Sequence, residues 1–418
     1  MHTAHFSAIL IWIISLASIS LMLIRPRRIA EAYWICGGAL ILVAARLLPL
    51  QQAAHAAYEG VDVYLFLAGM MILAELAREE GVFEWVADAA ARHAKNSPTR
   101  LLLLIYVVGT TVTAVLSNDA TAVVLTPAVL AAIRRVKVEP KPYLLACALI
   151  ANAASFMLPI SNPANLVVFD QNIPPLAAWF RIFLLPSSAS VLITFFCLRW
   201  LSRGQLHGKL SPEEGRVSLT TEGKLAFGGL IIAAIALVVA STRGLPLGLP
   251  TCCAAVFAVL VVTFRNRAIP VRVAKGVSWS ILPLVAGLFI IVEGMLNAGL
   301  QHLGRAGLNA LAGSSTWGGK SAAAFTVALL SNGMNNLPVG LMAGGAIRYT
   351  HQTGTLAHAL LLGVDLGPNL SVTGSLATIL WLVALRREGV EITAWEFLKV
   401  GAIVMPLALI GSLLFLWN

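Results

Sequence analysis

The sequence predicts an all-α polytopic membrane protein built from two inverted repeats. Three observations support this fold class. Of the 418 residues, 58% are hydrophobic and only 11% are charged, with a mean hydropathy of +0.85, whereas soluble domains carry about 25% charged residues. Apolar segments recur along the chain, and a bilayer crossing needs about 20 apolar residues. The same order of segments appears twice, on either side of a polar stretch at 202–223.

The first repeat is predicted over residues 1–201 and contains five spans, an amphipathic helix and a re-entrant hairpin. Its expected elements are spans at about 6–24, 33–50 and 62–77, an interfacial helix within 79–97, a hairpin at about 101–133, a broken helix at about 143–172 and a span at about 179–198. The hairpin is inferred because its apolar region is too short for two spans and is interrupted by Ser117-Asn118-Asp119. We expect a weakly charged loop between the second and third spans.

The second repeat, over 224–418, follows a cytoplasmic linker at 202–223. Its expected elements are spans at about 225–241, 246–264 and 278–296, an amphipathic segment around 297–317, a hairpin at about 320–347, a broken helix at about 356–385 and a last span at about 394–416. The second broken helix holds Asp365, Gly367-Pro368 and Asn369 in apolar surroundings. Proline removes a backbone donor and glycine is costly in a helix, so we expect the helix to break there.

The distribution of basic residues predicts the orientation. If each half has five crossings and a hairpin that does not cross, 23 of the 29 lysines and arginines lie on the cytoplasmic side and 6 lie outside. The positive-inside rule then predicts about ten crossings with both termini outside. It also explains the net charge of +10 without a nucleic-acid partner. A twelve-span arrangement, with each hairpin arm as a full span, is the alternative.

Polar side chains gather at the four predicted breaks. The two carboxylates are Asp119 and Asp365, and the neutral candidates are Ser117, Asn118, Asn162, Asn165, Asn332, Asn335, Asn336, Asn369 and Ser375. Secondary transporters bind substrates and ions at broken helices of this kind, and an intramembrane carboxylate is a candidate proton carrier. For each neutral residue the alternative is an ordinary helix cap or interhelical hydrogen bond. Their gathering at corresponding breaks favours a substrate-binding site.

Other classes of function lack a motif. The sequence contains no HExxH, GxSxG or Walker A pattern, so we expect neither an enzyme nor a cofactor or metal site. The five cysteines lie in apolar segments without a CxxC pair, which indicates core residues rather than disulfides or metal ligands. A passive channel would need a continuous pore, and accumulation against a gradient would distinguish it from a transporter.

Three motifs carry a resemblance to a known family. SNDATAVVLTP (117–127), SNGMNNLP (331–338) and DLGPNLSVTGSLATILWL (365–382) resemble the arsenical pump membrane protein, or arsenite/antimonite efflux (ArsB-type), family of the ion transporter superfamily. The resemblance covers essentially the whole chain. It implies a bacterial inner-membrane exporter, to which a soluble arsenite-stimulated ATPase can bind at the cytoplasmic face. Val364 stands where members often have a cysteine, which argues against a thiolate there.

The resemblance and the polar breaks together give a mechanism. Arsenous acid is mostly neutral near neutral pH, so its site needs hydrogen-bonding groups more than charge. We expect the neutral residues at the breaks to bind arsenite, and Asp119, Asp365 or both to exchange an inward-moving proton for it. The alternative is a Na⁺-coupled dicarboxylate or other anion carrier of the same superfamily. That carrier would need a cationic site, and no lysine or arginine falls inside a predicted break.

Overall fold

The computed structural model describes residues 2–169, 173–207, 210, 217–300, 302, 317–350 and 354–416. Every regular element in these ranges is helical, which confirms the all-α prediction. Six helices are long and apolar enough to cross a membrane, and α3 (Leu50–Glu59) and α4 (Val61–Glu79), bent by 46°, make a seventh crossing if they count as one span. The chain is therefore a multi-pass membrane protein.

The first half of the chain runs from α1 to η5. It comprises α1 (His2–Ile24), η1 (Pro26–Arg28), α2 (Glu31–Ala44), α3, α4, α5 (Val82–His93), α6 (Pro98–Val115), η2 (Ala120–Leu125), α7 (Thr126–Val136), α8 (Lys141–Ala153), η3 (Pro159–Ser161), α9 (Pro163–Phe169), α10 (Leu176–Leu201) and η5 (Arg203–Gln205). Helix α5 lies where the amphipathic helix was expected. Helix α3 was expected to be a loop, but its sequence LQQAAHAAYE is rich in strong helix formers.

The second half continues with a similar series. It comprises α11 (Thr221–Thr242), α12 (Gly248–Thr263), α13 (Ile269–Gly276), α14 (Ile281–Met295), η6 (Leu296–Leu300), α16 (Trp317–Met334), α17 (Asn336–Thr350), α18 (Thr355–Leu366), η7 (Gly367–Asn369), η8 (Val372–Gly374), α19 (Leu376–Arg387) and α20 (Ala394–Leu416). Most of the amphipathic segment expected around 297–317 lies outside the described residues. The inverted relation of the two halves stays a prediction.

The two hairpins turn in different ways. The first leaves α6 after Val115 and passes through Leu116 and Ser117 into the wide turns of η2. In the second, α16 continues through the Ser-Asn pair that we expected at the tip, and the break is confined to Asn335, whose φ is +76°. Helix α6 alone is long enough to cross a membrane, so the re-entrant placement of the first hairpin stays a prediction.

The two broken helices lie near the predicted positions. Helix α8 ends at Ala153, earlier than the expected break at 161–165, and the chain resumes as α9 at Pro163. Helix α18 ends at Leu366, directly before the Gly-Pro pair, and α19 begins at Leu376. Residues 156–158 and 370–371 between these segments are not helical, so backbone groups are freed at both breaks.

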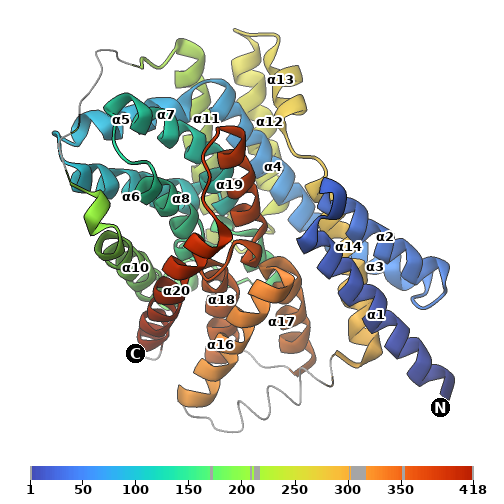
Figure 1. Cartoon of the computed structure of the whole chain (residues 1–418). Coiled ribbons are helices and arrows are strands. Elements are labelled where there is room, and N and C mark those ends of the chain that lie inside the picture. The colour runs from blue at the N-terminus through green and yellow to red at the C-terminus, as the bar shows by residue number, and fades with distance from the viewer. Residues whose placement is uncertain are drawn as a thin grey trace.

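Helices of the first half pack directly on helices of the second half. Helix α9 of the first half packs on α17, and η2 packs on α19. Within the second half α18 lies close to α16, because Gly363 and Gly367 face Ala324 and Ala328, and a Cβ at Gly367 would lie 2.5 Å from the Ala328 carbonyl oxygen. Small residues four apart allow such close approach in membranes. In Figure 1, α1 begins and α20 ends at the lower side, whereas α5, α7 and α13 lie at the upper side.

Candidate functional site

Two adjoining cavities lie beside the tip of the first hairpin. Both are lined by Leu67 of α4, Ile281 of α14, Asp119 and Pro163. Asp119, at the tip of the first hairpin, therefore lines both cavities.

The first cavity brings together residues from both hairpins and both broken helices. Six of the eleven predicted site residues line it: Asn118, Asp119, Asn162, Asn335, Asn336 and Ser375. Much of the remaining wall is apolar and comes from α4, α14 and α19, including Leu67, Leu284 and Leu376. The cavity thus has a small set of convergent polar groups in apolar walls, which is the usual make-up of a small-ligand site.

The tip of the first hairpin is held by its own side chains. Ser117 Oγ accepts a hydrogen bond from the Ala120 backbone N–H (3.1 Å), and Asn118 Oδ1 accepts one from the Asp119 N–H (2.9 Å). Ser117 is buried and lines the second cavity. Asp119 is half-buried as a residue, and no hydrogen bond or ion pair reaches its carboxylate from the described residues. It is therefore available to a ligand in either cavity.

Asn162 connects the first cavity to Asp365. Its Nδ2 donates to Asp365 Oδ1 at 2.7 Å, and its Oδ1 accepts from the Ala164 N–H at 3.0 Å, at the start of α9. Asp365 is fully buried, and its Oδ2 has no hydrogen-bond partner within the described chain. The carboxyl of Asp365 is thus separated from the cavity by one carboxamide.

Three predicted site residues make hydrogen bonds within the protein instead of lining a cavity. Asn165 Nδ2 donates to the carbonyl oxygens of Ser155 (2.8 Å) and Leu158 (3.2 Å), which fixes the first break. Asn332 Nδ2 donates to the Gly367 carbonyl oxygen (2.9 Å) and so ties α16 to the second break. Asn369 Oδ1 accepts from Asn152 Nδ2 (3.1 Å), which joins the two broken helices.

Two polar residues of the site were missed by the sequence analysis. Asn152 is fully buried, and its Nδ2 lies 3.4 Å from Thr378 Oγ1 as well as contacting Asn369. A carboxamide inside the apolar run 143–153 was the available signal. Glu31 lines the first cavity and forms an ion pair with Arg25 (3.0 Å). It follows a basic segment in the sequence, so it resembled part of a cytoplasmic loop.

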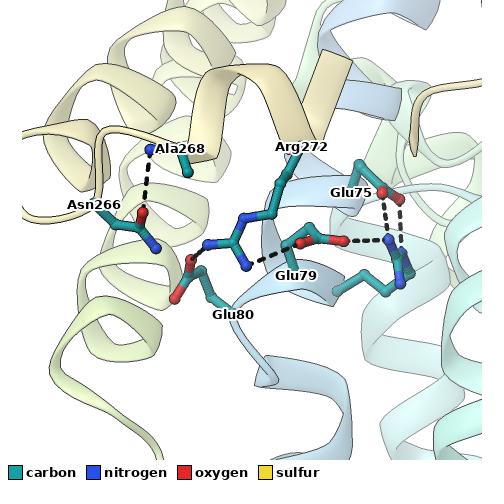
Figure 2. A network of polar contacts seen from close by, with 7 residues as sticks. Glu75, Glu79, Glu80, Asn266, Ala268 and Arg272 are labelled. Atoms are coloured by element: carbon teal, nitrogen blue, oxygen red, sulfur yellow. Dashed lines mark hydrogen bonds and ion pairs between the residues drawn. The ribbon is translucent and has the colours of Figure 1, made fainter. Parts of the chain in front are cut away.

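The second cavity reaches an ion-pair network at the end of α4. Glu75 lines it, and Arg78 Nε donates to Glu75 Oε2 at 2.8 Å. Figure 2 shows Arg272 of α13 between Glu79 (3.5 Å) and Glu80 (3.9 Å). This network joins α4 of the first half to α13 of the second half beside the cavity.

The polar groups that line the two cavities are carboxylates and neutral carboxamides and hydroxyls. Neither lining includes a lysine, an arginine or a cysteine among the described residues, whereas Asp119, Glu31 and Glu75 contribute carboxylates. No three histidine, cysteine, aspartate or glutamate side chains of the described chain are grouped to hold a metal ion. The arrangement can bind a small polar ligand and exchange protons at carboxylates.

Comparison with known proteins places the chain in a family. A family model described as a citrate transporter matches residues 8–367. An arsenical pump membrane protein of Escherichia coli is 30% identical over 355 residues, covering 81% of each chain, and an uncharacterised transporter of Mycobacterium tuberculosis is 28% identical over 95% of each chain. The crystal structure of the Alcanivorax borkumensis YdaH transporter has the same fold, with a TM-score of 0.57 at 14% identity over 92% of this chain and 96% of that chain. The chain is therefore a membrane transporter of the citrate transporter family and belongs to its arsenical pump membrane protein (ArsB-type) group.

Proposed function

We propose that this transporter exports arsenite and antimonite across the bacterial inner membrane in exchange for protons. The observation that carries the proposal is the lining of the first cavity, which combines four carboxamides and a hydroxyl with two carboxylates. Neutral arsenous acid has three hydroxyl groups, so carboxamides and a hydroxyl can both donate to it and accept from it. The 30% identity to an arsenical pump membrane protein supports arsenic as the cargo.

The predicted substrate-binding residues divide into two roles in this proposal. Asn118, Asn162, Asn335, Asn336 and Ser375 contact the substrate, because they line the first cavity. Asn165, Asn332 and Asn369 position the broken backbone around it, and Ser117 supports the hairpin tip beside the second cavity. Substitution of a contacting residue should therefore raise the KM for arsenite. Its main effect should be on substrate binding rather than on the free energy of unfolding.

Proton exchange is assigned to Asp119 and Asp365. Asp119 faces both cavities and has no partner in the described chain, so it can exchange protons with the cavity. An ionised Asp365 would be a buried charge without a compensating cation, which is costly, so Asp365 carries its proton while it is enclosed. Alternating access would then expose Asp365 and allow the proton to leave.

The cytoplasmic face is assigned to the side of α5, α7 and α13. This places both termini outside, as the positive-inside rule predicts. Two ion pairs support placing the basic segment after α7 and the loop after α19 on the same face. Arg134 of α7 contacts Glu388 after α19 (3.2 Å), and Lys141 contacts Glu396 (2.9 Å).

A second candidate function follows from the family model, which is described as a citrate transporter. A Na⁺-coupled carboxylate carrier would have to bind a polyanion. Asp119 in the first cavity would repel one, whereas the charge of Glu31 is balanced by Arg25 (3.0 Å). No lysine or arginine is part of the described lining. The electrostatics therefore favour a neutral substrate.

Arsenite uptake into everted membrane vesicles tests the proposal. With an imposed pH gradient and no ATP or sodium, we expect accumulation above the external concentration that a protonophore abolishes. Uptake that appears only with sodium and a carboxylate would instead support the second candidate. Uptake that stops at equal concentrations would indicate a passive channel.

A further inference from the structure

Two hollows lie on the seam between α6 and α10, away from the substrate cavities. One is a cleft of about 850 Å³ at the C-terminal end of α10, lined by Thr99, Arg199, Trp200, Arg203 and His207. The other is a groove of about 470 Å³ on the same two helices, lined by residues that include Leu103 and Val107 of α6 and Leu192 of α10. Arg199 lies seven positions after Leu192, a distance of about 10 Å along a helix.

The cleft concentrates positive charge that nothing in the described chain neutralises. Arg199 and Arg203 are exposed, and no ion pair or hydrogen bond to either side chain occurs within the described residues. Arg78, Arg92, Arg134 and Arg272, by contrast, each pair with a carboxylate. The Arg203 guanidinium lies 5.8 Å from the centre of the Trp200 ring. An arginine pair of this kind can bind a phosphate through several N–H donors.

The groove is apolar although it contains threonines. Thr110 and Thr111 hydroxyls donate to the carbonyl oxygens of Tyr106 (2.8 Å) and Val107 (3.0 Å) in their own helix. The Tyr106 hydroxyl donates across the seam to the Val191 carbonyl oxygen (2.8 Å), which fixes the groove floor. The hydroxyl hydrogens of these three residues are thus already donated to backbone carbonyl oxygens and are not available to a ligand. Leu103, Val107 and Leu192 are 44%, 52% and 55% exposed, so aliphatic surface remains open to lipid.

We propose that this seam is a binding site for an anionic phospholipid. Arg199 and Arg203 bind the headgroup phosphate, Trp200 lies at the membrane interface, and one acyl chain occupies the groove between α6 and α10. The charge and the geometry are complementary to such a lipid, since the cationic cleft lies at the end of two apolar helices and the groove runs back along them. Basic pockets between membrane helices on the cytoplasmic side bind anionic headgroups, and tryptophan is enriched at membrane interfaces.

Native mass spectrometry of the purified full-length chain tests this site. Phosphatidylglycerol and phosphatidylcholine with identical acyl chains are titrated separately into delipidated protein. We expect tighter binding of phosphatidylglycerol. The variant Arg199→Gln/Arg203→Gln should lose about 30-fold in affinity for phosphatidylglycerol, since each basic residue near an anionic surface contributes about fivefold. Its weak binding of phosphatidylcholine should change little.

Two further variants separate the headgroup from the acyl chain. Leu192→Trp fills the groove and should weaken both lipids, whereas Arg265→Gln/Arg267→Gln, a matched pair outside both hollows, should bind like the wild type. Unchanged phosphatidylglycerol affinity in Arg199→Gln/Arg203→Gln or in Leu192→Trp would overturn the proposal. Displacement of the lipid by inorganic phosphate would assign the arginines to a free anion, and displacement by polyglutamate would assign them to an acidic protein.

Discussion

Replacement of Asn162 by serine or alanine separates its two contacts. Serine caps a helix about as well as asparagine, so Asn162→Ser should keep the hydrogen bond to the Ala164 N–H but lose the one to Asp365 Oδ1. A hydrogen bond to a neutral carboxyl contributes about 0.5–1.5 kcal/mol to stability. Asn162→Ala also loses the cap, which adds about 1 kcal/mol. We therefore expect losses of about 1 kcal/mol for serine and about 2 kcal/mol for alanine.

Reversible denaturant unfolding in detergent, followed by circular dichroism, measures these losses. The same variants should raise the KM for arsenite in vesicles, because Asn162 lines the first cavity. A loss above about 3 kcal/mol for Asn162→Ser would contradict the account, since that size indicates a buried ionised carboxylate left without its partner. Stability equal to the wild type would show that Asn162 and Asp365 do not make this contact.

Three other predictions follow from the site and its packing. Asp119→Asn should retain the fold but lose pH-gradient-driven arsenite uptake in vesicles, and uptake that still follows the pH gradient would remove Asp119 from proton exchange. Gly363→Ala should lower stability by about 1–3 kcal/mol, because its Cβ would overlap the Ala324 carbonyl. The control Gly333→Ala, with open space around it, should not destabilise by overpacking in the same unfolding measurement. A variant with all five cysteines replaced by alanine should keep arsenite transport, since no described cysteine lines either cavity, and loss of transport in the folded variant would instead point to a thiolate site.

The fold class could be predicted from the sequence because apolar segments and glycine-proline breaks can be identified within short stretches of residues. Gly367-Pro368 ends α18 where the chemistry of proline predicts. The first break was placed too late, because α8 ends at Ala153 without a proline or glycine. There the break is stabilised by Asn165, whose side chain donates to Ser155 and Leu158 carbonyl oxygens. A contact between residues ten positions apart is not visible in local propensity.

The site was predicted in part for the same reason. Polar residues at breaks could be identified individually, but only packing decides which of them face a cavity. Asn332 is equivalent to Asn118 in sequence pattern, yet α16 continues through it and turns its carboxamide toward Gly367. Glu31 is the converse case, because the contact of α2 with α14 brings a residue beside a basic loop into the cavity.

Arsenite-driven proton movement tests the central claim most directly. The purified transporter is reconstituted in liposomes that contain a pH-sensitive dye, and an arsenite gradient is imposed without ATP or sodium. Coupled exchange predicts proton flux opposite to the arsenite gradient, its reversal when the gradient is reversed, and its loss in Asp119→Asn/Asp365→Asn. Arsenite flux without proton movement, or equal proton flux in the double variant, would contradict the account.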